Sequence, residues 1–260
     1  MTCLGDWLAE APFALGMSSG FFGFFAHAGM LSALETEGLC PTRLAGSSAG
    51  ALVAGAWAGG LSGEQIGAEL RALRRHHFWD PAPGPGLLRG RLFRRRLEAL
   101  VPSDFGPCRV PLTVSVHDVL DRRTRVISSG DLPRAIHASC AVPLMFHPVW
   151  IDRRPHVDGG VSDRPGLAGV PPRTRLLFHH LSSRSPWRRA GAPSMRLPRR
   201  PGLVSLVLDG LPRAGPFHLE RGVAAFGAAQ EACRRALGSP LRDGVCRVTA
   251  RARPLGQTPG

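Results

Sequence analysis

Hydrophobic positions along the chain follow two patterns, one typical of strands and the other typical of helices. Short apolar runs bounded by polar or turn residues predict strands at residues 12–17, 42–45, 112–116, 125–128, 149–157, 176–181 and 203–208. Apolar residues at helical spacing predict helices at residues 27–37, 49–58, 63–76, 87–101, 132–139 and 217–237. The strands at 112–116 and 125–128 are expected to pair as a hairpin. Because strands and helices alternate, the pattern predicts an α/β layered fold.

The length of the chain favours one domain. With 260 residues, 43% of them hydrophobic, it can bury one sizeable core, and we expect a single domain at residues 1–246. Residues 247–260 are expected to form a flexible tail, and residues 182–202, rich in arginine, proline and serine, a long exposed loop. The chain contains no uncharged apolar run of about 18 residues and does not begin with a basic segment followed by an apolar one. We therefore expect a cytoplasmic protein.

The basic residues of the chain are unusual in kind and number. There is no lysine, so all 33 basic residues are arginines, against 19 acidic residues. Without lysine a Walker-type phosphate loop, a Schiff base and a lysine general base are excluded. The net charge of +14 indicates attraction to a polyanion, with generic surface charge as the plain alternative. We expect no nucleic-acid partner, because no known module is present and aromatic residues are not interleaved with the basic ones.

The six cysteines are scattered along the chain without a Cys-x-x-Cys pair. In a chain with no recognisable signal segment, this spacing predicts reduced core thiols rather than disulfides or a zinc site. No other cluster of metal-ligand residues stands out, so we expect no metal.

Two segments match Gly-x-Ser-x-Gly, the pattern of a nucleophile elbow, in which a serine sits on a tight turn between a strand and a helix. One runs from Gly46 to Gly50 around Ser48, and the other covers residues 16–20 around Ser18. Small residues follow the first match and allow its helix to pack closely under a sheet, whereas bulky phenylalanines follow the second. We therefore favour Ser48 as the nucleophile. The alternative is a serine that only caps a core helix.

The segment Gly20, Phe21, Phe22 and Gly23 follows the first predicted strand. Glycines at such a position allow backbone N–H groups to converge on an anion, so the segment is a candidate oxyanion hole. It does not fit a dinucleotide fingerprint, because the first glycine and the acidic ribose partner are missing.

Asp158, followed by Gly159 and Gly160, lies at the end of a predicted strand. A carboxylate presented on a tight turn can act as a general base when it lies within hydrogen-bond reach of a serine. Taken alone, the triplet is better explained as an ordinary Asp-Gly turn.

Together these segments resemble the patatin-like phospholipase family. Its members carry a glycine-rich oxyanion motif, then Gly-x-Ser-x-Gly, and much further on Asp-Gly-Gly or Asp-Gly-Ala, which is the order found here. Residues 24–31 look like the family's helix after the oxyanion loop, and residues 138–146 look like its Ala-Ser-x-Ala-x-Pro-x-x-Phe segment. The resemblance covers about residues 12–165. It implies a layered fold with a central, mostly parallel sheet flanked by helices.

The resemblance also implies an activity: hydrolysis of fatty-acyl esters or phospholipids by a Ser-Asp dyad, without a catalytic histidine and without a metal or other cofactor. By this resemblance Ser48 is the nucleophile, Asp158 is the base, and amides of residues 20–23 hold the oxyanion. The phenylalanines in that loop depart from the family's glycine triplet and make the acyl entrance narrower and more apolar. The basic segment 87–101 and residues 187–189 are candidates for peripheral contact with an anionic membrane.

Two other interpretations remain open. In the first, the chain is a Ser-His-Asp hydrolase in which His179 or His180 completes a triad with Ser48 and Asp158. In the second, the chain is not an enzyme, and its basic surface binds anionic lipid.

Overall fold

A computed structural model describes residues 2–182 and 195–250. Its centre is a nine-stranded, mostly parallel sheet with the strand order β11-β10-β9-β1-β2-β4-β8-β7, in which β5 pairs with β4. The strands are β1 (Ala14–Met17), β2 (Arg43–Ser47), β4 (Leu112–Asp118), β5 (Arg123–Ile127), β7 (Val149–Ile151), β8 (Arg154–Asp158), β9 (Leu176–His180), β10 (Leu203–Asp209) and β11 (Val245–Thr249). A separate two-stranded sheet consists of β3 (Gly86–Leu88) and β6 (Leu144–Phe146).

Strand β1 lies where the order of the sheet reverses. It pairs in parallel with β2 on one side and with β9 on the other. From β1 the chain builds β2 and β4, and much later it returns to add β9, β10 and β11 on the opposite side. Open α/β sheets hold ligands beyond the carboxyl ends of the strands at such a point. The loop after β1 and the turn after β2 lie there.

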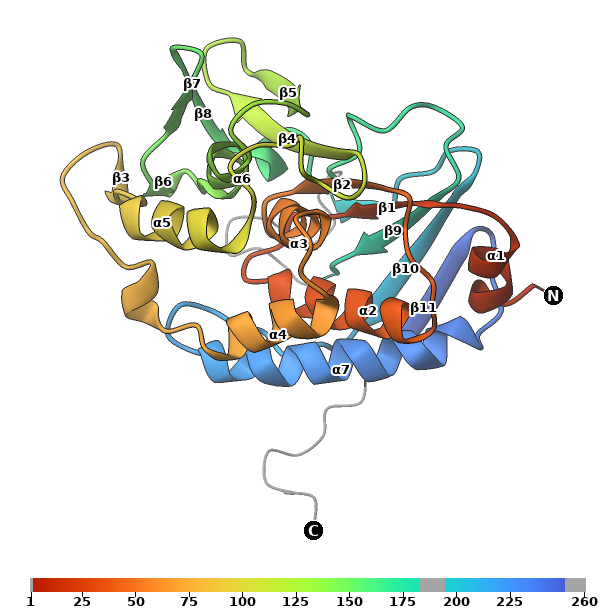
Figure 1. Ribbon diagram of the computed structural model, residues 1–260. Coiled ribbons are helices and arrows are strands. Elements are labelled where there is room, and N and C mark those ends of the chain that lie inside the picture. Colours follow the sequence, from red (N-terminus) through yellow and green to blue (C-terminus); the bar gives the residue numbers. More distant parts are fainter. Residues whose placement is uncertain (1, 183–194, 251–260) are drawn as a thin grey trace.

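The helices flank this sheet. In Figure 1, α2, α4 and α7 form one layer along a face of the sheet. The helices are α1 (Leu4–Glu10), α2 (Phe24–Thr36), α3 (Ala49–Ala58), α4 (Gly63–Arg71), α5 (Arg91–Leu100), α6 (Leu132–Cys140) and α7 (Leu219–Leu237), with 3₁₀ turns at Arg75–His77 and Gly159–Val161. The predicted α/β fold with a central, mostly parallel sheet is confirmed, and so is the predicted hairpin, now β4 and β5.

The core lies mainly between the sheet and these helices. On β1, Leu15 and Met17 point into the large cluster that α2, α3 and α7 complete. Ala14, which precedes Leu15, points to the opposite face, where a smaller cluster contains Val170 and Phe178. Because side chains alternate along a strand, β1 is covered on both faces, which explains its almost entirely apolar sequence. None of the described helices is both long enough and apolar enough to cross a bilayer.

Two predicted helices differ from the structure at their ends. The helix predicted at 63–76 ends at Arg71, because the guanidinium of Arg74 donates to the carbonyls of Arg71 and Leu73 and so satisfies the end of the helix. The helix predicted at 87–101 begins only at Arg91, after β3. The carboxylate of Asp80 accepts hydrogen bonds from the first N–H groups of that helix and fixes where it starts.

The boundary predicted at residue 247 is too early. Residues 247–249 belong to β11, which pairs in parallel with β10, and the N–H of Ala250 donates to Asp209. Strand β11 lies at the edge of the sheet and is short, with polar residues on one side. Its sequence therefore lacks the continuous apolar run that predicts a buried strand. Residues 251–260 lie outside the described residues, as do 183–194, which include most of the predicted loop and residues 187–189.

Candidate active site

Ser48 occupies the turn between β2 and α3. Its backbone has φ 52° and ψ −118°, a conformation that is rare for a residue with a side chain. A Cβ atom on Gly46 would lie 2.5 Å from the carbonyl carbon of Gly50, so the turn closes only with glycine there. The strand, the tight turn and the helix are the context that a nucleophile elbow requires. Ser18, the centre of the other match, is fully buried, and its Oγ accepts a hydrogen bond from the N–H of Leu181.

Asp158 lies within hydrogen-bond reach of Ser48. The Oγ of Ser48 donates to Oδ2 of Asp158 at 2.6 Å, although the two residues are 110 positions apart. The other carboxylate oxygen, Oδ1, accepts the N–H of Gly160 at 2.7 Å, in the 3₁₀ turn that begins with Gly159. Strand β8 presents this carboxylate because it pairs with β4, the neighbour of β2. Two motifs that are distant in the sequence therefore meet at one point.

Helix α6 holds the serine turn from the other side. The Oγ of Ser139 accepts the N–H of Ser48 at 2.8 Å and donates to the carbonyl of Ser115 at 2.7 Å. The thiol of Cys140 donates to the carbonyl of Ser48 at 3.2 Å, and burial raises the pKa of this thiol well above its usual value, so the thiol stays protonated. Neither of these two supports follows from the Gly-x-Ser-x-Gly or Asp-Gly-Gly motif alone. They are indicated in the sequence only by residues 138–146, which match the Ala-Ser-x-Ala-x-Pro-x-x-Phe pattern of the family.

The loop from Ser18 to Gly23 brings backbone N–H groups near Ser48. The N–H of Gly23 donates to the carbonyl of Gly20 at 2.9 Å, so in this structure that predicted oxyanion donor is engaged within the loop. Within the described residues, the N–H groups of Gly20, Phe21 and Phe22 have no acceptor. The N–H of Ala49, in the first turn of α3, is a further donor that the sequence interpretation did not include. Its signal is its position directly after the elbow serine.

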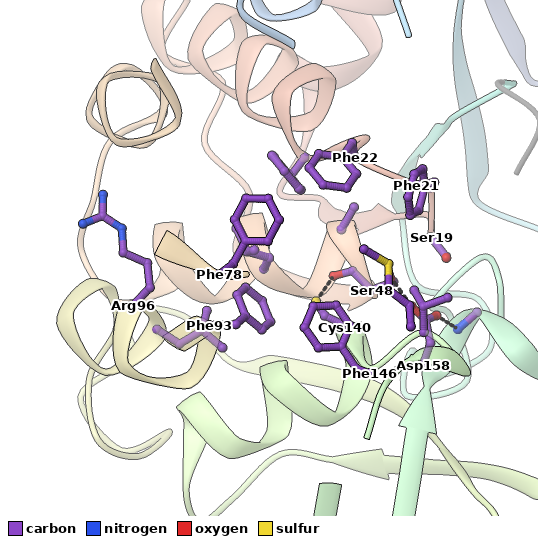
Figure 2. A pocket seen from close by; sticks show the side chains of 18 of the residues that line it. Ser19, Phe21, Phe22, Ser48, Phe78, Phe93, Arg96, Cys140, Phe146 and Asp158 are labelled. Atoms are coloured by element: carbon purple, nitrogen blue, oxygen red, sulfur yellow. Dashed lines mark hydrogen bonds between the residues drawn. The ribbon is translucent and has the colours of Figure 1, made fainter. Parts of the chain in front are cut away.

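A cavity of about 540 Å³ opens beside Ser48. Its wall is mainly apolar and includes Phe22, Phe24, Leu70, Phe78, Phe93 and Leu97. Figure 2 shows Ser48 and Asp158 at one end of this pocket, Phe78 and Phe93 along it, and Arg96 at the opposite end. A narrow apolar space that ends at a serine is suited to a hydrocarbon chain with a polar head. The phenylalanines of the loop after β1 form part of it, as predicted.

The histidines considered as members of a triad lie elsewhere. The side chain of His179 contacts His27, with their Nδ1 atoms 2.8 Å apart, and Nε2 of His27 donates to the carbonyl of Ser18 at 2.8 Å. Neither His179 nor His180 lines the pocket. Because the proton of neutral His27 lies on Nε2, where it is donated to the carbonyl of Ser18, Nδ1 of His27 is unprotonated. It therefore accepts a hydrogen bond from the Nδ1–H of His179. This neutral pair supports the start of the loop at residue 18 and does not reach Ser48.

Stability is expected to fall in acid because of His27. Burial lowers the pKa of His27 to about 4, whereas an unfolded histidine has a pKa near 6.5. Between these values the unfolded chain binds the proton and the folded chain does not, so the free energy of unfolding falls as the pH falls through this window. By pH 4.5 the loss from this one group is about 2–3 kcal/mol. Urea unfolding of the wild type and of His27→Gln, at pH 7.5 and pH 4.5, measures it.

The variant His27→Gln should lose this part of the pH dependence while remaining less stable than the wild type at pH 7.5. His76→Gln, which changes an exposed histidine, serves as the control. An equal loss of stability between the two pH values in wild type and His27→Gln would contradict the prediction.

The described residues contain no group of three or more His, Cys, Asp or Glu side chains that could hold a metal ion. All six cysteines are free, but the prediction that they lie in the core is wrong for Cys40, which is exposed, while Cys233 and Cys246 are buried. The groups that meet directly at the serine turn are the hydroxyl of Ser48, the carboxylate of Asp158, the hydroxyl of Ser139 and the thiol of Cys140.

The fold and the turn around Ser48 are typical of α/β proteins that carry a serine on a nucleophile elbow. A family model described as patatin-like phospholipase matches residues 15–169. The chain therefore belongs to the patatin-like phospholipase family, as its motifs predicted.

Relatives and solved structures resemble the chain over part of their length. Uncharacterized NTE family proteins of Mycobacterium bovis and Mycobacterium tuberculosis are 31% identical to it over 161 residues. The match covers 60% of this chain and 45% of each relative, so the chain spans about half the length of these proteins. The crystal structure of VipD from Legionella pneumophila superposes with a TM-score of 0.55 at 15% identity, over 76% of this chain and 50% of that one. This last likeness concerns the fold.

Proposed function

We propose that this chain is a lipid acyl hydrolase that cleaves fatty-acyl esters, phospholipids included, through an acyl-enzyme on Ser48. The observation that carries the proposal is the 2.6 Å hydrogen bond from Ser48 Oγ to Asp158 Oδ2 at one end of an apolar pocket. A carboxylate that accepts the hydroxyl proton directly can activate a serine without a histidine between them. Membership of the patatin-like phospholipase family supports the same chemistry.

The reaction proceeds in two steps at these groups. As Oγ of Ser48 attacks the ester carbonyl carbon, its proton passes to Asp158, and the carbonyl oxygen becomes an oxyanion. The protonated carboxyl then gives the proton to the leaving alcohol oxygen, and the acyl group remains on the serine. In the second step Asp158 takes a proton from water, the resulting hydroxide attacks the acyl carbon, and the proton returns to Ser48 as the fatty acid leaves.

Backbone amides stabilise the oxyanion in both steps. The N–H groups of Gly20, Phe21 and Ala49 lack acceptors within the described residues and lie around the serine turn, so they are the donors that we assign to this role. The N–H of Ser48 itself is bound to Ser139 and is not assigned. The acyl chain occupies the apolar pocket, where each buried methylene contributes to binding.

Labelling with a serine-reactive alkyl fluorophosphonate, followed by mapping of the modified peptide, tests the proposal. We expect one adduct, on Ser48, which is absent from Ser48→Ala. An adduct on Ser18 would overturn the assignment of the elbow. If detergent is present and no adduct forms on the wild-type chain, the interpretation as a binding protein without enzymatic activity is favoured instead.

We further propose that the rim of the pocket rests on an anionic bilayer. Leu87 of β3 and Leu144 of β6 are 52% and 76% exposed, on two strands that pair with each other, and Leu144 also lines the pocket. Arg89, Arg91 and Arg95 follow β3, are exposed, and have no carboxylate partner among the described residues. Exposed apolar side chains beside unpaired cations are typical of surfaces that bind anionic membranes.

Replacing these three arginines with glutamine is expected to weaken binding to phosphatidylglycerol vesicles about 100-fold, since each cation contributes about 1 kcal/mol. Vesicle co-sedimentation at low and high salt measures this loss. As a control with the same change in charge, Arg221→Gln, Arg234→Gln and Arg242→Gln should bind like the wild type. Binding that is indifferent to phosphatidylglycerol content and to salt would exclude this surface.

A further inference from the structure

The pocket beside Ser48 is apolar along its length and charged at both ends. Asp158 and Arg164 lie at the serine end, where the carbonyl of Arg164 accepts the N–H of Ser19. The opposite end is lined by Glu69 and Arg96, and Figure 2 shows Arg96 beyond the phenylalanines of the wall. At the serine end, the chemistry proposed above accounts for Asp158, and the guanidinium of Arg164 donates to the carbonyl of Leu181. That chemistry does not account for the charges at the other end.

Glu69 and Arg96 come from two helices and meet across the end of the pocket. Glu69 lies on α4 and Arg96 on α5, and the guanidinium Nη2 donates to the carboxylate Oε2. Their side chains are 43% and 29% exposed, so the charged heads reach solvent. The adjacent residues Leu70 and Leu97 are almost fully buried and line the same pocket. The ion pair therefore stands at the boundary between the apolar wall and water.

A hydrocarbon chain that fills the pocket meets this boundary with its methyl end. Up to that point each added methylene is transferred from water to an apolar wall, which favours binding about fourfold per group. Beyond it, a longer chain has to displace water from the carboxylate of Glu69 and the guanidinium of Arg96. A hydrocarbon forms no hydrogen bonds with these groups, so the displaced water is not replaced as a partner. The benefit of lengthening the chain ends where the wall ends.

We propose that the Glu69–Arg96 ion pair sets the longest acyl chain that the pocket accepts, an inference that rests on the proposed acyl hydrolase function. The two side chains determine specificity and take no part in the chemical step. The preferred substrates are therefore esters of fatty acids that are just long enough for the terminal methyl group to reach this ion pair.

The test compares acyl chain-length profiles. For the wild type, kcat/KM for a series of p-nitrophenyl esters from butanoate to octadecanoate is expected to rise with length and then fall. The double variant Glu69→Leu/Arg96→Leu continues the apolar wall and conserves net charge. Its maximum is expected to move by two or more methylenes, with a gain of about tenfold for the first esters beyond the wild-type maximum.

Two further variants separate specificity from structure. The exchange Glu69→Arg/Arg96→Glu keeps an ion pair at the boundary and is expected to restore the wild-type maximum. Arg221→Leu changes an exposed arginine of α7 that does not line the pocket, and it should leave the profile unchanged. If the double leucine variant is folded and active but keeps the wild-type maximum, the inference is overturned.

Failure of the proposed function gives a different result. If the wild type hydrolyses none of the esters, the acyl hydrolase proposal fails first, and the ion pair is tested by binding. Displacement of a fluorescent fatty acid by saturated acids of increasing length is then measured on Ser48→Ala, with and without the two leucines. The longest tightly bound acid should shift with the leucines, and an unchanged length dependence contradicts the inference.

Discussion

Replacing Asp158 with asparagine is expected to lower kcat for ester hydrolysis by about 10³- to 10⁴-fold, with little change in KM. Asparagine fills the same space next to Ser48, but its neutral amide does not take the hydroxyl proton that the carboxylate accepts over 2.6 Å. Ser48→Ala should lose at least as much activity, because no acyl-enzyme forms. Steady-state hydrolysis of a p-nitrophenyl ester by each purified variant measures both effects.

Asp152→Asn provides the matched control for the carboxylate. Asp152 is an exposed aspartate in the turn between β7 and β8, and β8 is the strand that carries Asp158. Replacing Asp152 should leave kcat unchanged. Circular dichroism establishes that all the variants are folded. If Asp158→Asn retained more than about a tenth of the wild-type kcat, the carboxylate would not be the general base.

Gly50→Ala is expected to destabilise the protein by about 3 kcal/mol or more. A Cβ atom at this position would lie 2.1 Å from the carbonyl oxygen of Met17 and 2.6 Å from its carbonyl carbon. Both atoms are backbone at the end of β1, so a side-chain rotation does not relieve the overlap. Because α3 begins at the serine turn, any shift of the helix also moves Ser48, and activity is expected to fall with stability. Guanidinium unfolding followed by fluorescence measures the change.

Gly227→Ala is the matched control for this substitution. Gly227 lies on the exposed side of α7, where an added Cβ atom would meet nothing within 4 Å. In a helix, alanine in place of glycine is favourable by up to about 1 kcal/mol. The same chemical change should therefore have opposite signs at the two positions. Equal effects would mean that the close approach of α3 to β1 is not what requires glycine at residue 50.

The elements that sequence analysis located best are those whose signals are local. The buried strands at Ala14–Met17 and Leu203–Asp209 are mainly apolar runs, and Leu219–Leu237 has a regular helical period. The start of α5 was misplaced because it depends on Asp80, a residue outside the helix that binds its first amides. The hydrophobic pattern within residues 87–101 carries no information about a carboxylate that comes from an earlier segment of the chain.

The same distinction applies to the candidate site. The glycine spacing around Ser48 indicated a tight turn, but the meeting of Ser48 with Asp158 depends on the pairing of β8 with β4 and was expected only from the resemblance. The support from Ser139 depends on where α6 packs, so spacing alone could not predict it. His179 was considered as a third member because it follows Ser48 and Asp158 along the chain, and its contact with His27 is set by tertiary structure.

The anchoring of the loop after β1 has a consequence for how the chain can be divided. Ser48, Asp158 and the family match all lie within residues 15–169. The bonds that hold Ser18 come from later residues: the N–H of Ser18 donates to the carbonyl of His179, and the N–H of Leu181 donates to the Oγ of Ser18. A fragment that stops after the family match would retain every motif yet leave one edge of β1 unpaired. We therefore expect that the segment carrying the signature does not fold on its own, because β9, β10 and β11 complete the sheet beside β1.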